Sequence, residues 1–181
     1  RASTFHPPTL DLLDRFAGVT ADLIRLGLIA PTWQLRDRAT GPVVTWDMGL
    51  LAGETQHPYR VQVEQWRLTG ILAERLAKLS HAALRYSHEV VGASQDGDRA
   101  TLRVKTPSGE ELFAARYAIG CEGATSPMRR SMGIAYEGMT LPERYLTLST
   151  RHDFARDLPG LTYVNYVSDP EEWLVLLRVA D

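Results

Sequence analysis

The stretch RVQVEQWRLTGILAERL, residues 60–76, opens the strongest helical pattern of the chain. Apolar residues recur there at the spacing of one helix face, and the pattern continues for three further residues. The residues on this face are Leu68, Ile71, Leu72, Leu76 and Leu79. The spacing predicts a helix over residues 64–79 whose apolar face joins a hydrophobic core.

Three β-rich runs follow this helix, at about residues 88–94, 100–106 and 111–119. Asp96-Gly97 and Ser108-Gly109 separate them and favour tight turns, so the segment predicts an antiparallel meander. Before the helix, residues 32–38 and 43–48 predict a hairpin. Two helices are expected nearer the start, one capped by Thr9 and ended by Gly18, the other over residues 21–26.

Beyond the meander, the segment CEGATSPMRRSMG, residues 121–133, predicts a single helical turn. Ser126 can cap it, Pro127 can take its first position, and Gly133 can end it. Three more strands are expected at about residues 145–152, 161–168 and 172–179. We therefore expect one domain over residues 1–140 and the start of a second over residues 141–181.

Composition excludes several classes of protein. Twenty Lys and Arg against 22 Asp and Glu give a formal net charge of −2 with no basic block, so neither nucleic acid nor an anionic membrane is an expected partner. The lone Cys121 and five dispersed His indicate neither an internal disulfide nor a metal site, and the setting expected is cytoplasmic.

Three stretches, in this order, carry a resemblance to a known family: RASTFHPPTLDLLDRFAG at residue 1, RVQVEQWRLTGILAERL, and YAIGCEGATSPMRRSMGI from residue 117. They resemble the FAD-binding fold of the group A flavoprotein aromatic hydroxylases. The resemblance implies a mixed α/β fold: a partial FAD-binding, Rossmann-like domain with a β-meander, followed by part of an antiparallel substrate-binding sheet.

The resemblance also implies cofactor-binding residues. Arg1 matches the family's Arg near the FAD diphosphate, and Gln65 matches a Gln at a helix start that contacts the flavin. Glu122 and Gly123 stand where the family has Asp-Gly, and Arg129 matches an Arg that helps receive NAD(P)H. Each can instead serve locally: Arg1 and Gln65 as solvated residues, Glu122 as a turn cap, Arg129 as a helix-end cover.

The Gly-rich turn that receives the FAD diphosphate in such folds is absent, because no G-x-G-x-x-G occurs in the 181 residues. We therefore interpret the chain as an internal fragment that is inactive alone. The implied whole enzyme uses FAD, NAD(P)H and O2 on a small phenol-like substrate. The alternative is a non-catalytic fragment or split subunit that binds no flavin.

Substrate contacts are expected from the strand over residues 161–168. One face would present Tyr163 and Asn165, the other Thr162, Tyr166 and Ser168, and the pattern does not choose between them. The final strand is expected to leave one edge unpaired, which favours a homo-oligomer.

Overall fold

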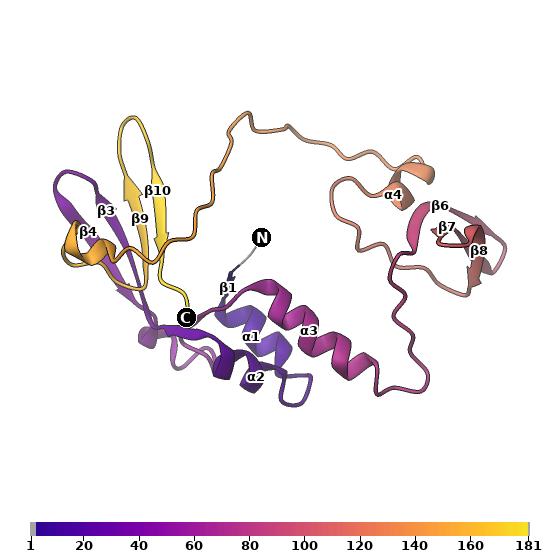
Figure 1. Cartoon of the computed structure of the whole chain (residues 1–181), viewed down its shortest axis with the longest axis horizontal. Coiled ribbons are helices and arrows are strands. Elements are labelled where there is room, and N and C mark those ends of the chain that lie inside the picture. Colours follow the sequence, from indigo (N-terminus) through magenta and orange to yellow (C-terminus); the bar gives the residue numbers. More distant parts are fainter. Residues whose placement is uncertain (1–2, 181) are drawn as a thin grey trace. The chain divides into compact units, whose positions relative to one another are not determined.

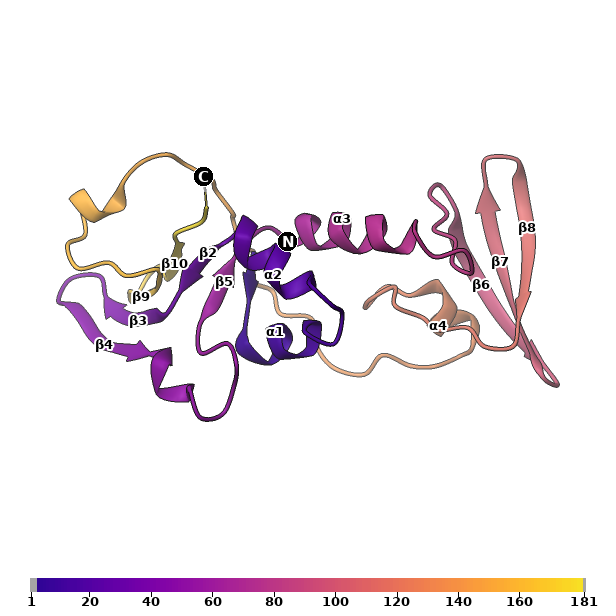
Figure 2. The same cartoon turned by 90° about the horizontal axis from the view of Figure 1, so that it is seen from below.

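A computed structural model describes residues 3–180 of the chain. Its internal contacts divide it into two units: a first unit of residues 1–83 and 149–181, and a second unit of residues 84–148. Figure 1 and Figure 2 show the elements of each unit from two directions. The expected division into domains near residue 141 concerns cofactor and substrate roles, and it stays a prediction.

The core of the first unit lies between a three-stranded antiparallel sheet and three helices. The sheet has the order β1 (Thr4–Phe5), β5 (Arg60–Gln62), β2 (Leu28–Ala30), and the helices are α1 (Pro7–Leu13), α2 (Val19–Leu26) and α3 (Gln65–Leu76). The buried cluster consists of Phe5, Leu10, Leu13, Val19, Leu23, Val61 and Val63. Burying such side chains supplies the main free energy of folding.

The predicted apolar face of α3 is confirmed in its first half only. Leu68, Ile71 and Leu72 pack against the core cluster. Leu76 and Leu79 are 40% and 44% exposed, and α3 ends at Leu76, three residues earlier than expected. The last turn of α3 is instead held by Arg75, which donates hydrogen bonds to the Ala17 oxygen and to Asp22 Oδ2.

The prediction for the first helix is wrong at both ends. The helix begins at Pro7, and His6 is its N-cap residue, because prolines suit the first helical positions where the missing N–H costs nothing. Thr9 therefore lies inside α1. Gly18 does not end α1; with φ at 77° it precedes α2 as that helix's N-cap residue.

The second sheet of the first unit has the order β10 (Leu174–Leu177), β9 (Val164–Ser168), β3 (Thr32–Asp37), β4 (Gly41–Asp47). The predicted β3–β4 hairpin is confirmed. However, β9 pairs with β3 in parallel, so the expected antiparallel sheet is mixed. No strand forms over residues 145–152, and that prediction is wrong. The short 3-10 helices η1 (Met48–Leu51) and η2 (Phe154–Arg156) lie in the connections.

The second unit is the predicted meander: β6 (Glu89–Asp96), β7 (Arg99–Thr106) and β8 (Gly109–Ala115). The predicted turn helix is α4 (Pro127–Ser131), and Ser126 caps it by accepting a hydrogen bond from the Arg129 backbone N–H at 3.0 Å. The Ala93 N–H of β6 donates to Ser131 Oγ at 2.8 Å and ties α4 to the meander. The mixed α/β fold class is confirmed. None of the helices within residues 3–180 is long and apolar enough to cross a bilayer.

Gly27 allows β5 to approach the end of α2. A Cβ at this position would lie 2.5 Å from Val61 Cγ1 and 3.1 Å from the Gln62 backbone oxygen. Gly70, in α3, has open space around it. We predict that Gly27→Ala lowers the free energy of unfolding by about 1–3 kcal/mol through overpacking.

The matched variant Gly70→Ala should raise that free energy by about 0.5–1 kcal/mol, because alanine is the better helix former. Urea unfolding of both variants measures the difference. Equal effects of the two substitutions would contradict the close approach at Gly27.

Candidate functional site

The N-terminus of α3 has no side-chain cap. Strand β5 runs into the helix through Val63 and Glu64, and the Glu64 side chain makes no capping hydrogen bond to the helix. Glu64 instead accepts from Arg67 Nε at 2.8 Å, and this hydrogen bond lowers the pKa of its carboxyl group. Gln65, the first helical residue, is exposed. Free backbone N–H groups and the helix dipole at such an end favour a phosphate.

The predicted cofactor residues fall into separate parts of the chain. Arg1 lies outside the described residues. Gln65 belongs to the first unit, whereas Glu122, Gly123 and Arg129 belong to the second. The structure brings these last three together around the start of α4.

Glu122 caps the turn that leads into α4. Its Oε2 accepts a hydrogen bond from Ser126 Oγ and another from the Met128 backbone N–H at 3.2 Å. Gly123 has φ at 79°, and a Cβ there would meet nothing within 4 Å. The local role that the sequence left open for Glu122 is therefore present, and a further cofactor role remains a prediction.

Arg129 holds the same segment together. Its Nη1 donates to the Ile134 oxygen at 2.9 Å and its Nη2 to the Ala124 oxygen at 3.0 Å. The guanidinium also lies 5.0 Å from the Tyr136 ring centroid. Both terminal nitrogens thus bond to backbone, and only the buried Nε lacks a partner among the described residues. A role toward NAD(P)H stays a prediction.

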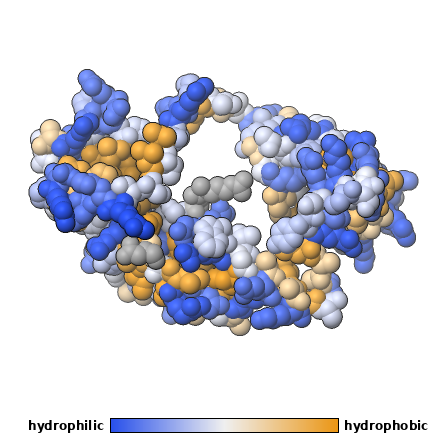
Figure 3. All heavy atoms as spheres, viewed as in Figure 1, coloured by the Kyte–Doolittle hydropathy of each residue, from blue (hydrophilic) through white to orange (hydrophobic). Residues whose placement is uncertain are grey.

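An aromatic cluster with a cation lies on one face of the β10-β9-β3-β4 sheet. The Trp33 and Trp46 rings stack at 3.9 Å, and Tyr166 meets Trp33 edge-on at 5.6 Å. Arg60 of β5 places its guanidinium 5.0 Å from the Trp33 ring and donates to the Tyr166 hydroxyl at 3.4 Å. Apolar side chains gather over this sheet in the view of Figure 3.

The opposite face of this sheet is covered by residues 159–162. Gln34 Nε2 donates to the Gly160 oxygen at 3.2 Å, and both terminal nitrogens of Arg36 lie 3.3 Å from the Pro159 oxygen. Asn165, only 2% exposed, bonds to the backbone N–H and oxygen of Thr162. Of the two faces that the sequence offered, the one carrying Tyr166 is therefore the more open.

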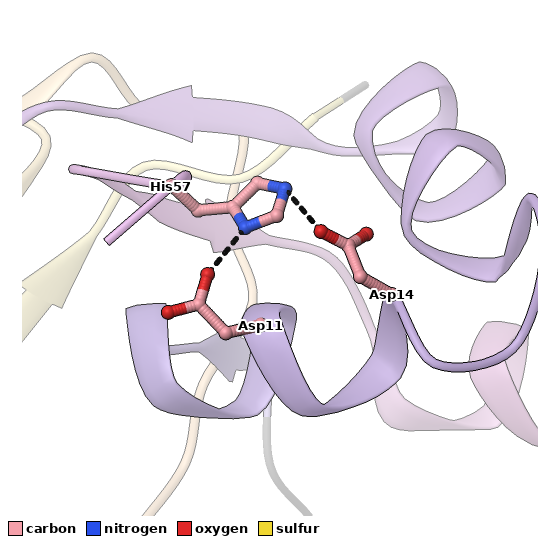
Figure 4. Close-up of side chains that lie close together, drawn as sticks. All are labelled: Asp11, Asp14 and His57. Carbon is pink, nitrogen blue, oxygen red and sulfur yellow. Dashed lines mark hydrogen bonds and ion pairs between the residues drawn. The ribbon is translucent and has the colours of Figure 1, made fainter.

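A third cluster joins the loop after η1 to α1 (Figure 4). His57, 7% exposed, places Nδ1 2.8 Å from Asp11 and Nε2 3.5 Å from Asp14. Asp11 also accepts from Thr55 Oγ1 at 2.7 Å. The two carboxylates and the imidazole are close enough to one another to hold a metal ion. Yet each ring nitrogen already faces a carboxylate, so the arrangement is that of a clamp between loop and helix.

Sequence reasoning missed Arg60, Trp33 and His57 as members of clusters. The strand RVQ of β5 is only three residues long and shows no alternation that identifies it. An arginine beside two buried valines was the one available signal. The partners of these residues are far along the chain, so their meeting depends on the tertiary structure.

A family model described as the FAD binding domain matches residues 1–172. The solved p-nitrophenol 4-monooxygenase of Pseudomonas putida matches 98% of this chain and 44% of that chain, with a TM-score of 0.83 and 27% identity. Para-nitrophenol 4-monooxygenase of a Pseudomonas species is 28% identical over 99% of this chain and 44% of the relative.

Another relative, 6-hydroxy-3-succinoylpyridine 3-monooxygenase of Pseudomonas putida, is 32% identical over 85% of this chain and 39% of its own length. The chain thus spans less than half the length of these relatives. The fold defines the class of protein, which is that of the FAD-binding proteins. More particularly, the chain belongs to the FAD-binding family of the aromatic-ring hydroxylases, and the expected resemblance is confirmed.

The capping role of Glu122 leads to a stability prediction. Glu122→Ala should lower the free energy of unfolding by about 1 kcal/mol, because Ser126 and the Met128 N–H lose their acceptor. Glu137→Ala, an exposed carboxylate nearby, is the control and should change it little. Thermal melts measure both variants, and equal melting temperatures would contradict the cap.

The clamp at His57 leads to a pH prediction. Hydrogen bonds from Thr55 and His57 lower the pKa of Asp11. A carboxyl group whose pKa is lowered by folding stabilises the protein above its unfolded pKa, and this stability is lost as pH falls through the folded pKa. Asp11→Asn should therefore lower the melting temperature at neutral pH. The difference in melting temperature between this variant and the parent protein should shrink below about pH 4.

Glu74→Gln, an exposed carboxylate of α3, is the control. Melts across a pH series measure both variants. A difference for Asp11→Asn that stays constant down to acidic pH would contradict this role of the carboxylate.

Proposed function

We propose that the protein carrying this chain is an FAD- and NAD(P)H-dependent monooxygenase that hydroxylates a phenol-like aromatic ring. The observation that carries the proposal is the likeness of 98% of the chain to p-nitrophenol 4-monooxygenase, with a TM-score of 0.83. The relatives are named as monooxygenases of para-nitrophenol and of 6-hydroxy-3-succinoylpyridine, both aromatic compounds. These names support a phenol-like substrate for this protein.

The proposed reaction inserts one atom of O2 into a ring C–H bond, while the other atom leaves as water. Two electrons and a proton come from NAD(P)H, and a second proton comes from solvent. FAD, when bound, supplies the redox chemistry of this exchange. The residues of this chain bind the cofactor, orient the ring and exclude water.

The residues present at α3 fit the FAD diphosphate. The helix N-terminus has no side-chain cap, and Gln65 stands there exposed, with a donor and an acceptor on one amide. In the same proposal Arg1 contacts the diphosphate, Gly123 lets backbone approach the cofactor, and Glu122 and Arg129 help to receive NAD(P)H. The open face with Trp33 and Tyr166 then offers aromatic surface to the substrate ring.

We also propose that the 181 residues alone do not turn over. No G-x-G-x-x-G turn occurs in them, and that turn supplies the backbone donors for the FAD diphosphate in dinucleotide folds. The cytoplasmic setting and self-association both stay predictions. Among the described residues, β10 pairs only with β9, which leaves its outer edge available to another strand.

The role of Gln65 can be tested in the intact flavoprotein. Gln65→Glu places a carboxylate at the helix N-terminus, where the helix dipole stabilises it, so the melting temperature of the apoprotein should be kept or raised. The same carboxylate repels the diphosphate, and the dissociation constant of FAD should rise about tenfold or more, the value of a hydrogen bond to a charged group.

Gln95→Ala, which removes an exposed amide of β6, is the control. Flavin fluorescence titrations and NAD(P)H oxidation with 4-nitrophenol measure binding and turnover. Unchanged FAD affinity in Gln65→Glu would contradict the site. An intact protein that binds no FAD would instead favour the non-catalytic alternative.

A further inference from the structure

Arg60 is a buried cation that has no anionic partner among the described residues. Its side chain comes from β5, and the residue is 8% exposed. Within residues 3–180, no carboxylate forms an ion pair with it, and its buried Nε has no hydrogen-bond partner. A guanidinium stays charged at any working pH, and a buried charge without a partner is costly. An anion at this place would offset that cost.

Arg36, in the same unit, differs from Arg60 in what its terminal nitrogens bind, although its buried Nε also has no hydrogen-bond partner among the described residues. It is 3% exposed, and none of the carboxylates in the described part of the chain forms an ion pair with it. However, Nη1 and Nη2 both donate to the Pro159 oxygen at 3.3 Å, and Nη1 is 3.4 Å from Gln34 Oε1. Arg36 is thus hydrogen-bonded to the backbone of the segment 159–162, which covers its face of the sheet. Within residues 3–180, the Arg60 side chain donates one hydrogen bond, from Nη1 to the Tyr166 hydroxyl oxygen at 3.4 Å.

The surroundings of Arg60 are aromatic. The Trp33 ring lies 5.0 Å from the guanidinium, and Trp46 stacks on Trp33. His6 adds no negative charge; burial and then the charge of Arg60 lower its pKa. Tyr166 contributes a hydroxyl that can donate to an oxygen. A ligand that suits this place has a flat ring for the tryptophan wall and an oxyanion for the cation and the hydroxyl.

We infer that Arg60, with Tyr166 and Trp33, is the specificity-determining group that recognises the oxyanion of an ionised aromatic substrate. This inference rests on the proposed function and deepens it: the protein selects the phenolate form of the ring. Arg60 lowers the pKa of the bound phenol, because a neighbouring cation favours the charged form. The Trp33 face holds the ring beside that oxyanion.

The test uses two probes on the intact flavoprotein: 4-nitrophenol, which ionises, and 4-nitroanisole, its methyl ether, which does not. The absorbance of the phenolate reports both binding and the pKa of the bound phenol. We expect the parent protein to bind the phenolate about tenfold or more tightly than the ether, the value of a charged hydrogen bond. Arg60→Gln should abolish this preference, keep the affinity for the ether, and raise the pKa of the bound phenol.

Three further variants complete the design. Arg60→Lys keeps the charge and should keep part of the preference, which matters where Arg60→Gln fails to fold. Tyr166→Phe should weaken binding of the phenolate and leave binding of the ether unchanged. Arg25→Gln removes an arginine of α2 whose side chain is 70% exposed. This variant should change the affinity for neither probe.

Several outcomes would overturn the inference. An unchanged phenolate preference in Arg60→Gln would mean that Arg60 does not bind the oxyanion. The same result with a shifted flavin reduction potential would assign Arg60 to the cofactor. Failure of both probes to bind the parent protein would also overturn it. Turnover is measured separately from binding. A preserved phenolate preference without any NAD(P)H-driven hydroxylation would contradict the proposed function, but it would not contradict the anion site at Arg60.

Discussion

The burial of β5 is the constraint on which both candidate sites of the first unit depend. Val61 is fully buried and Val63 is 1% exposed, and β5 pairs with β1 on one side and β2 on the other. Because successive residues of a strand point to opposite sides, burying Val61 leaves Arg60 directed elsewhere. The chain then needs only Val63 and Glu64 to reach Gln65. A three-residue strand thus positions a cation and a helix N-terminus.

The buried polar side chains near this core differ in the hydrogen bonds that they make. Gln34, Arg36 and Asn165 are closed in by hydrogen bonds to the segment that covers their face of the sheet, so their role is structural. Among the described residues, Arg60, which is 8% exposed, makes no hydrogen bond to that segment; its Nη1 donates to the Tyr166 hydroxyl, and its Nε, like that of Arg36, has no partner. Since a buried charge with few partners is expensive, the backbone hydrogen bonds of Arg36 hold the fold, whereas the role proposed for Arg60 is to bind a ligand.

Local patterns were sufficient for several elements. The β3–β4 hairpin, the meander and the cap of α4 by Ser126 all rest on contacts between residues close in the sequence, and each was predicted. The predicted strand over residues 145–152 does not form, because a strand depends on pairing with a neighbouring strand, which local composition alone does not supply. The start of α1 failed for a local reason: the two prolines outweighed Thr9 as a signal.

The sequence by itself determined the family, the mixed α/β class and the residues that the family resemblance carries, including Gln65 and the Glu122-Gly123 turn, because these depend on motifs that are short and contiguous. Only the tertiary structure decided which face of β9 is covered, that β9 runs parallel to β3, and that Arg60 meets Trp33 and Tyr166. The physical reason is distance along the chain. Trp33 and Tyr166 approach because two separate strands pair, and no local spacing encodes a pairing of that kind.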